Sequence, residues 1–199
     1  MMEHLAKIDT QLFLFLNGLN SSFWDVAMWH ISGKYTWIPL YLLIIFFVAK
    51  RHRWQTLWIL LAIALVVVLA DQLSVHLLKN VFERLRPCHN PDIKELVHVV
   101  KRCGGKYGFV SSHAANSFGV AVFLVCLIRK RWFSIGILFW ALLVSYSRIY
   151  IGVHYPGDIL VGAALGSAIG FGIWKLLEYI DRKTGNRIIK PPQSKHAVH

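Results

Sequence analysis

The stretch "SRIYIGVHYPGD", residues 147–158, brings an arginine, a histidine and an aspartate together in a chain dominated by apolar runs. The imidazole of His154 can attack phosphorus, and the carboxylate of Asp158, four residues later, can hold the other ring nitrogen and support the developing positive charge. The guanidinium group of Arg148 can clamp a phosphate through paired N–H donors. These residues therefore indicate phosphate chemistry with a histidine nucleophile.

A second group of residues is basic and suits the same anion. Lys79 lies seven residues before Arg86, and the next residue, Pro87, prevents a helix from continuing. A guanidinium group matches phosphate oxygens in pairs, and a lysine adds a compact charge. For Lys79 taken alone, a snorkelling role at the membrane interface is an equally acceptable interpretation.

A third group begins an apolar run at residues 111–113. Ser111 and Ser112 stand where a hydroxyl can cap a helix whose first backbone amides face outward, and such a helix start binds anions. His113, in the first turn, would then lie beside a bound phosphate. By itself this stretch is more typical of a capped helix with an incidental histidine.

The elements that must position these residues are apolar helices. The chain has 199 residues, of which 56% are hydrophobic and only 16% are charged, so it is too apolar for one small soluble domain. A helix needs about 20 apolar residues to cross a bilayer. Five segments qualify, and a sixth span is a less favoured alternative. The five are residues 35–51, 54–78, 113–130, 132–149 and 157–178.

These patterns predict an all-α integral membrane helix bundle with a preceding amphipathic helix at residues 3–17, which ends at Asn17-Gly18. That helix either lies in the membrane interface or packs on the bundle. Short loops rich in Lys and Arg at 50–53 and 129–131, and the basic tail at 181–199, are expected to be cytoplasmic. The three polar groups then meet at the opposite surface, toward the periplasm or cell exterior.

The three groups, in this order and spacing, resemble the type 2 phosphatidic acid phosphatase superfamily of membrane lipid phosphatases. Its pattern is Lys-x6-Arg-Pro, then Pro-Ser-Gly-His, then Ser-Arg-x5-His-x3-Asp, and residues 79–87 and 147–158 fit the first and third parts. The middle part departs from the pattern, because Val110 and Ser112 replace its proline and glycine. A serine can still donate its backbone amide, although glycine allows a closer approach.

The resemblance implies a phosphatase domain at 1–180 and a role for each matching residue. It implies that His154 forms a phosphohistidine, that Asp158 orients it, and that His113 protonates the leaving oxygen. It implies no metal and no cofactor. The residues expected to bind the phosphoryl group are Lys79, Arg86, Ser111, Ser112 and Arg148.

The expected substrate is a membrane lipid phosphate on the outer face of a bacterial inner membrane, and undecaprenyl diphosphate is favoured. Lipid A, phosphatidylglycerophosphate and phosphatidate remain open, as does phosphoryl transfer to another lipid. The alternative from another class is a non-catalytic scaffold or transporter component. An intact nucleophile with its orienting carboxylate favours chemistry over binding alone.

Several features outside the motifs carry further expectations. Cys88 and Cys103 bracket a loop on the side expected to be oxidising, where they can form a disulfide.

Three glycines at 162, 166 and 170 predict a close helix-packing face in the last span. The net charge of +12 does not indicate nucleic-acid binding, because it lies on the loops and tail of a membrane protein.

Overall fold

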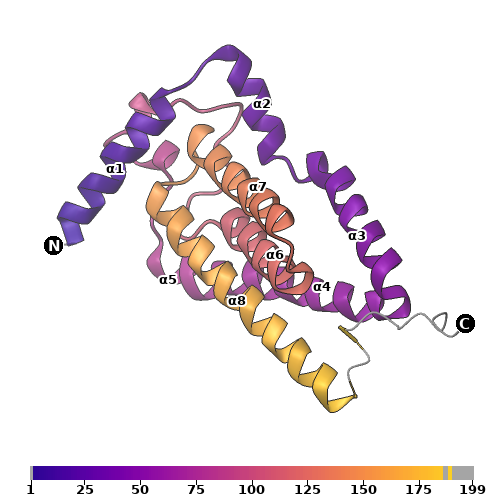
Figure 1. Ribbon diagram of the computed structural model, residues 1–199. Coiled ribbons are helices and arrows are strands. Elements are labelled where there is room, and N and C mark those ends of the chain that lie inside the picture. The colour runs from indigo at the N-terminus through magenta and orange to yellow at the C-terminus, as the bar shows by residue number, and fades with distance from the viewer. Residues whose placement is uncertain (1, 186–187, 190–199) are drawn as a thin grey trace, which may run out of the picture.

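The computed structural model describes residues 2–185 and 188–189, apart from the side chains of Met2, Leu77, Lys79 and Asn80. Within this part the chain is helical and contains no strand. The helices pack as a bundle, with α1, α2 and the turn between α7 and α8 at one end and the turns between α3 and α4 and between α6 and α7 toward the other (Figure 1). The tail residues 186–187 and 190–199, predicted to be basic and cytoplasmic, lie outside the described residues.

Five apolar helical segments correspond to the five predicted spans. They are α3 (Ile38–His52), α4 (Thr56–Gln72) with the π-helical η3 (Leu73–Lys79), α6 (Ser112–Ile128), α7 (Arg131–Tyr150) and α8 (Pro156–Lys183). Three described helical stretches are long and apolar enough to cross a membrane: Lys34–His76, Arg131–Tyr150 and Pro156–Lys183. The first of these changes direction at Arg53, whose φ is 51°, and therefore supplies both α3 and α4 (Figure 1).

The N-terminal helix α1 (Met2–Gly18) packs on the bundle, and its position in the membrane interface stays a prediction. Phe13 and Asn17 are fully buried against the bundle, whereas Leu5 and Phe15 are 55% and 64% exposed. An outward apolar face on a packed helix is what a position in the membrane interface requires. The following helix, α2 (Ser22–Ser32), was not predicted from the sequence.

The glycines of α8 let it approach α6 at backbone distance, as predicted. A methyl group on Gly162 would lie 2.6 Å from the backbone oxygen of Ser111, and one on Gly166 would overlap the backbone of Ala115. One turn further on, a methyl group on Gly170 would overlap the backbone of Gly119 in α6. Close backbone approach is the usual use of such a stripe in membrane helices.

The long connection between η3 and α6 is folded against the bundle. It contains the single turn α5 (Asn80–Phe82), the short 3-10 helices η4 (Pro87–His89) and η5 (Lys94–Leu96), and a backbone bridge between Leu85 and Tyr107. Asn17 ties this connection to α1 and α7, because its amide donates to the backbone oxygens of His98 and Tyr150 at 3.0 and 2.8 Å.

Candidate active site

His154 and Asp158 form a buried pair where α8 begins. Nδ1 of His154 lies 3.5 Å from Oδ2 of Asp158, and the two residues are 1% and 0% exposed. Asp158 occupies the third position of α8, and its Oδ2 also accepts the backbone N–H of Tyr155 at 3.0 Å. Because Pro156 starts the helix, the chain turns sharply between the two side chains. The structure thus brings together the two residues that the motif predicts as nucleophile and orienting carboxylate.

Arg84 holds the other oxygen of Asp158, a contact that sequence reasoning missed. Its Nη1 donates to Oδ1 of Asp158 at 3.0 Å, and its Nη2 donates to Asp9 of α1 at 2.8 Å. The sequence motifs assigned no role to Arg84. Its position two residues before Arg86 in a basic stretch was the available signal, but nothing in the sequence pairs it with residues 74 and 75 positions away.

Arg86 lies against the backbone that leads into His154. Its Nε donates to the backbone oxygen of Tyr107 at 3.2 Å, and its Nη1 donates to that of Val153 at 3.5 Å. Burial lowers the pKa of Arg86, and the negative charge of Asp158 partly offsets that effect. An arginine keeps its charge at neutral pH under such a shift. Arg86 is therefore a fixed positive charge beside the candidate nucleophile.

Arg148 lies near the end of α7 and is close enough to Arg86 for the two positive charges to repel each other. Its Nη1 donates to the hydroxyl of Ser32 at the end of α2. Guanidinium groups bind anions such as phosphate through paired donors, and phosphate binding by Arg86 and Arg148 stays a prediction. Lys79 ends η3, and its side chain lies outside the described part of the structure.

The start of α6 joins this group through backbone contacts. Ser111 caps the helix as predicted, because its hydroxyl accepts the N–H of Ala114 at 3.4 Å. The backbone N–H of Ser111 donates to the backbone oxygen of Asp158 at 3.1 Å, so that group serves the fold, and phosphate binding by Ser111 stays a prediction. The hydroxyl of Ser112 lies 2.7 Å from that of Ser74 in η3.

His113 opens onto a cavity of about 450 Å³ between α3, α4, α6 and α7. The walls are mostly apolar and include Tyr41, Ile63, Val120 and Trp140. A cavity of this size and character accepts part of a hydrocarbon chain. His113, the predicted proton donor, therefore borders a mostly apolar cavity.

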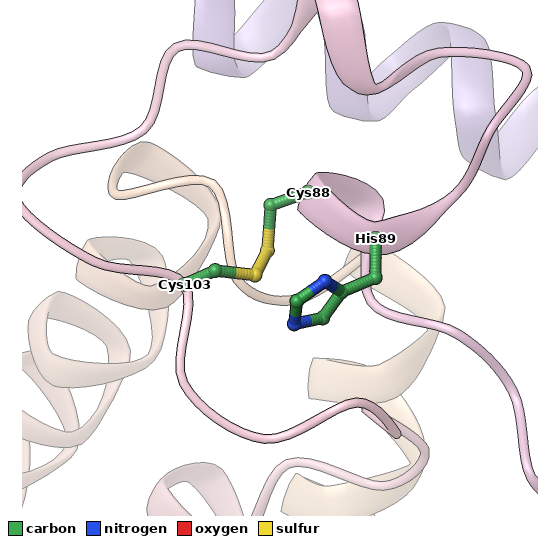
Figure 2. Close-up of side chains that lie close together, drawn as sticks. All are labelled: Cys88, His89 and Cys103. Atoms are coloured by element: carbon green, nitrogen blue, oxygen red, sulfur yellow. A yellow bond between two sulfur atoms is a disulfide. The ribbon is translucent and has the colours of Figure 1, made fainter.

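Cys88 and Cys103 are joined by a disulfide with Cα atoms 6.1 Å apart, and the ring of His89 lies beside it (Figure 2). The ligand atoms of these three residues lie within 4.8 Å of one another, as in a metal site. A thiolate is the form of cysteine that binds metal, and the disulfide removes both. In the described structure the disulfide therefore links the segment that contains Arg86 to the loop that carries Tyr107.

Comparison with known proteins agrees with the geometry of the site. The sequence pattern of the PAP2 superfamily matches residues 55–182. The chain is 48% identical over 192 residues to a lipid A 4'-phosphatase of Bacteroides thetaiotaomicron, covering 94% of this chain and 83% of the relative. It is 34% identical over 158 residues to an undecaprenyl-diphosphatase of Sulfolobus acidocaldarius, covering 78% of this chain and 68% of that protein.

A crystal structure with a similar fold is also known. The crystal structure of a transmembrane PAP2-type phosphatidylglycerolphosphate phosphatase from Bacillus subtilis superposes with a TM-score of 0.68 at 26% identity, covering 90% of this chain and 89% of that one. The helical architecture described above is thus shared with a transmembrane phosphatase.

Proposed function

The chain belongs to the PAP2 superfamily and is a membrane lipid phosphatase, and from this premise we propose that its substrate is lipid A. The observation that carries the proposal is the 48% identity to a lipid A 4'-phosphatase over 94% of the chain. Undecaprenyl diphosphate, the substrate that the sequence alone favours, is supported by a weaker match of 34% identity over 78% of the chain. It therefore gives way to lipid A, which the sequence left open.

In the proposed reaction His154 attacks phosphorus while its Nδ1 pairs with Asp158. The bond between phosphorus and the lipid oxygen breaks, and His113 gives a proton to that oxygen. Asp158 stabilises the positive imidazole that results. Lys79, Arg86 and Arg148, together with outward-facing amides at the start of α6, balance the negative charge of the phosphoryl group.

A water molecule completes the cycle. His113, now neutral, accepts a proton from the water as the water oxygen attacks phosphorus, and the bond between phosphorus and His154 breaks. Inorganic phosphate leaves, and both histidines return to their starting forms. The apolar cavity beside His113 supports a lipid substrate, because it can hold the beginning of an acyl chain while the phosphate lies among the arginines.

We place the site toward the periplasm. The basic turns at 50–53 and 129–131 lie at the end of the bundle away from α1 and α2 (Figure 1). Positive loops favour the cytoplasmic side, so the end that carries His154 faces outward. A bacterial inner membrane is the setting that the lipid A phosphatase relative supports.

Phosphate release by the detergent-purified protein tests the proposal. Lipid A, undecaprenyl diphosphate and phosphatidylglycerophosphate are compared at equal concentration with a chelator present, and His154→Ala is the control. We expect lipid A to be the best substrate by about tenfold or more in kcat/KM, and the variant to lose roughly a thousandfold. Mass spectrometry of the product shows whether the 4'-phosphate is the one removed. Preference for undecaprenyl diphosphate would contradict the proposal.

A further inference from the structure

One arginine outside the family pattern connects Asp158 to the N-terminal helix. Arg84 donates to Oδ1 of Asp158 at 3.0 Å and to Oδ2 of Asp9 at 2.8 Å, so a single guanidinium group bridges two carboxylates. The same group lies over the ring of Tyr155, with its central carbon 3.9 Å from the ring centroid. Arg84 therefore contacts two of the residues that shape the turn after His154.

Asp9 holds that turn directly as well. Its Oδ1 accepts the backbone N–H of Gly157 at 2.8 Å, while its Oδ2 accepts from Arg84. A methyl group on Gly157 would lie 2.8 Å from Oδ2 of Asp9, so a larger residue here would displace the carboxylate of Asp9. One turn later on α1, Phe13 packs edge-on against Tyr155 with ring centroids 5.3 Å apart.

These contacts leave Asp158 with both oxygens engaged. Oδ1 accepts from Arg84, and Oδ2 accepts the N–H of Tyr155 and faces Nδ1 of His154. A carboxylate held at one oxygen by a planar, charged donor cannot rotate without losing that bond. The bond from Arg84 therefore fixes which oxygen faces the imidazole and at what angle.

We propose that Arg84 and Asp9 are positioning residues that hold the carboxylate of Asp158 and the turn at Gly157 in the geometry that His154 requires. The inference rests on the proposed function, in which His154 is the nucleophile. Neither residue is assigned to phosphate binding, since the guanidinium group of Arg84 is turned toward two carboxylates. Loss of Arg84 should therefore weaken stabilisation of the transition state more than binding of the substrate.

The test compares steady-state kinetics of Arg84→Gln, Arg84→Lys, Asp9→Asn and the Asp9→Asn/Arg84→Gln double variant. We expect Arg84→Gln to lower kcat about 30- to 100-fold with KM changed less than about threefold. Arg84→Lys keeps the positive charge but cannot donate two parallel hydrogen bonds. On a logarithmic scale, its kcat should regain about a third or more of the loss seen in Arg84→Gln. Asp9→Asn should lower kcat about tenfold, and the double variant should be no slower than Arg84→Gln, since the two residues act as one unit.

Matched controls come from the same two segments of the chain. Arg102→Gln removes an exposed arginine from the loop after η5, and Glu3→Gln removes an exposed carboxylate from α1. Both should keep kcat within about twofold of the wild-type protein, as surface changes usually do. Thermal unfolding of every variant identifies any that do not fold.

The possible outcomes distinguish failure of the positioning role of Arg84 and Asp9 from failure of the proposed function. If wild-type protein releases no more phosphate than His154→Ala from any lipid, the proposed function fails. If the wild type is active and a folded Arg84→Gln keeps its kcat, or raises KM alone, the positioning role is overturned. If Arg84→Gln does not fold, Arg84→Lys and Asp9→Asn decide, and wild-type kcat in both overturns it.

Discussion

Ser111 donates its backbone N–H to the backbone oxygen of Asp158 at 3.1 Å and so ties the first residue before α6 to the first turn of α8. The two helices carry the predicted proton donor and the orienting carboxylate, respectively. Gly162 makes the contact possible, because a methyl group there would lie 2.6 Å from the backbone oxygen of Ser111. The glycine stripe of α8 is thus part of what sets the distance between the two halves of the site.

Gly162→Ala should therefore damage both stability and activity. The added methyl group must push the start of α6 away from α8, and such overpacking costs about 1–3 kcal/mol. We expect a lower melting temperature in detergent and a kcat about tenfold lower, because a small displacement of catalytic groups is costly. Gly172→Ala is the control, since nothing lies within 4 Å of the methyl group it adds. Equal behaviour of the two variants would contradict the packing argument.

The disulfide should stabilise the fold and keep Arg86 in place. Cys88 and Cys103 are 15 residues apart, and closing a loop of that length is worth about 3 kcal/mol in the chain-entropy model. Replacing both with serine should lower the melting temperature and raise KM about three- to tenfold, because the loop that holds Arg86 loosens. Cys126→Ser, which changes the free cysteine, should leave KM unchanged. An unaltered KM in the double variant would show that the disulfide contributes to stability alone.

The pH dependence of stability should reveal the contact at Asp25. Its Oδ1 accepts hydrogen bonds from Nε2 of His98 and from the hydroxyl of Tyr150, both at 2.8 Å. Burial raises the pKa of Asp25, but these two hydrogen bonds and the charge of His98 together outweigh it, so the pKa falls below its usual 3.8. A carboxylate with a lowered pKa in the folded protein stabilises it above the unfolded pKa, and this is lost as the pH falls through the folded pKa.

Melting temperatures of the wild-type protein and Asp25→Asn measure this effect. We expect the wild type to melt higher at neutral pH and the difference to shrink once the pH falls below about 4. A difference of the same size at neutral and acidic pH would show that the charge of Asp25 plays no part.

Much of the fold follows from the sequence, because the thickness of a bilayer limits the length of each apolar helix. The predicted span at 132–149 becomes Arg131–Tyr150, and that at 157–178 becomes Pro156–Lys183. The cap at Ser111 was also predicted from its position before an apolar run. The helix α2 was missed, because Ser22–Ser32 is too short for a span and mixes Asp25 and His30 with tryptophans.

The polar motifs predicted the pairing of His154 with Asp158, because four residues separate them across a turn. The contacts of Arg84 could not be predicted in the same way. They join a loop, α1 and α8, and such long-range pairs depend on how the helices pack rather than on local spacing. The same reason hid the roles of Asp9 and of Asn17, which bonds to backbone on two other segments.

Trapping the covalent intermediate tests the central claim most directly. The purified protein is mixed with lipid substrate labelled with radioactive phosphorus, quenched in denaturant at alkaline pH within milliseconds, and digested for peptide mapping. A phosphoramidate is stable to base and labile to acid, so we expect acid-labile label on the peptide that carries His154, and none in His154→Ala. Label at another residue, or turnover of lipid phosphate by His154→Ala at the wild-type rate, would contradict the account.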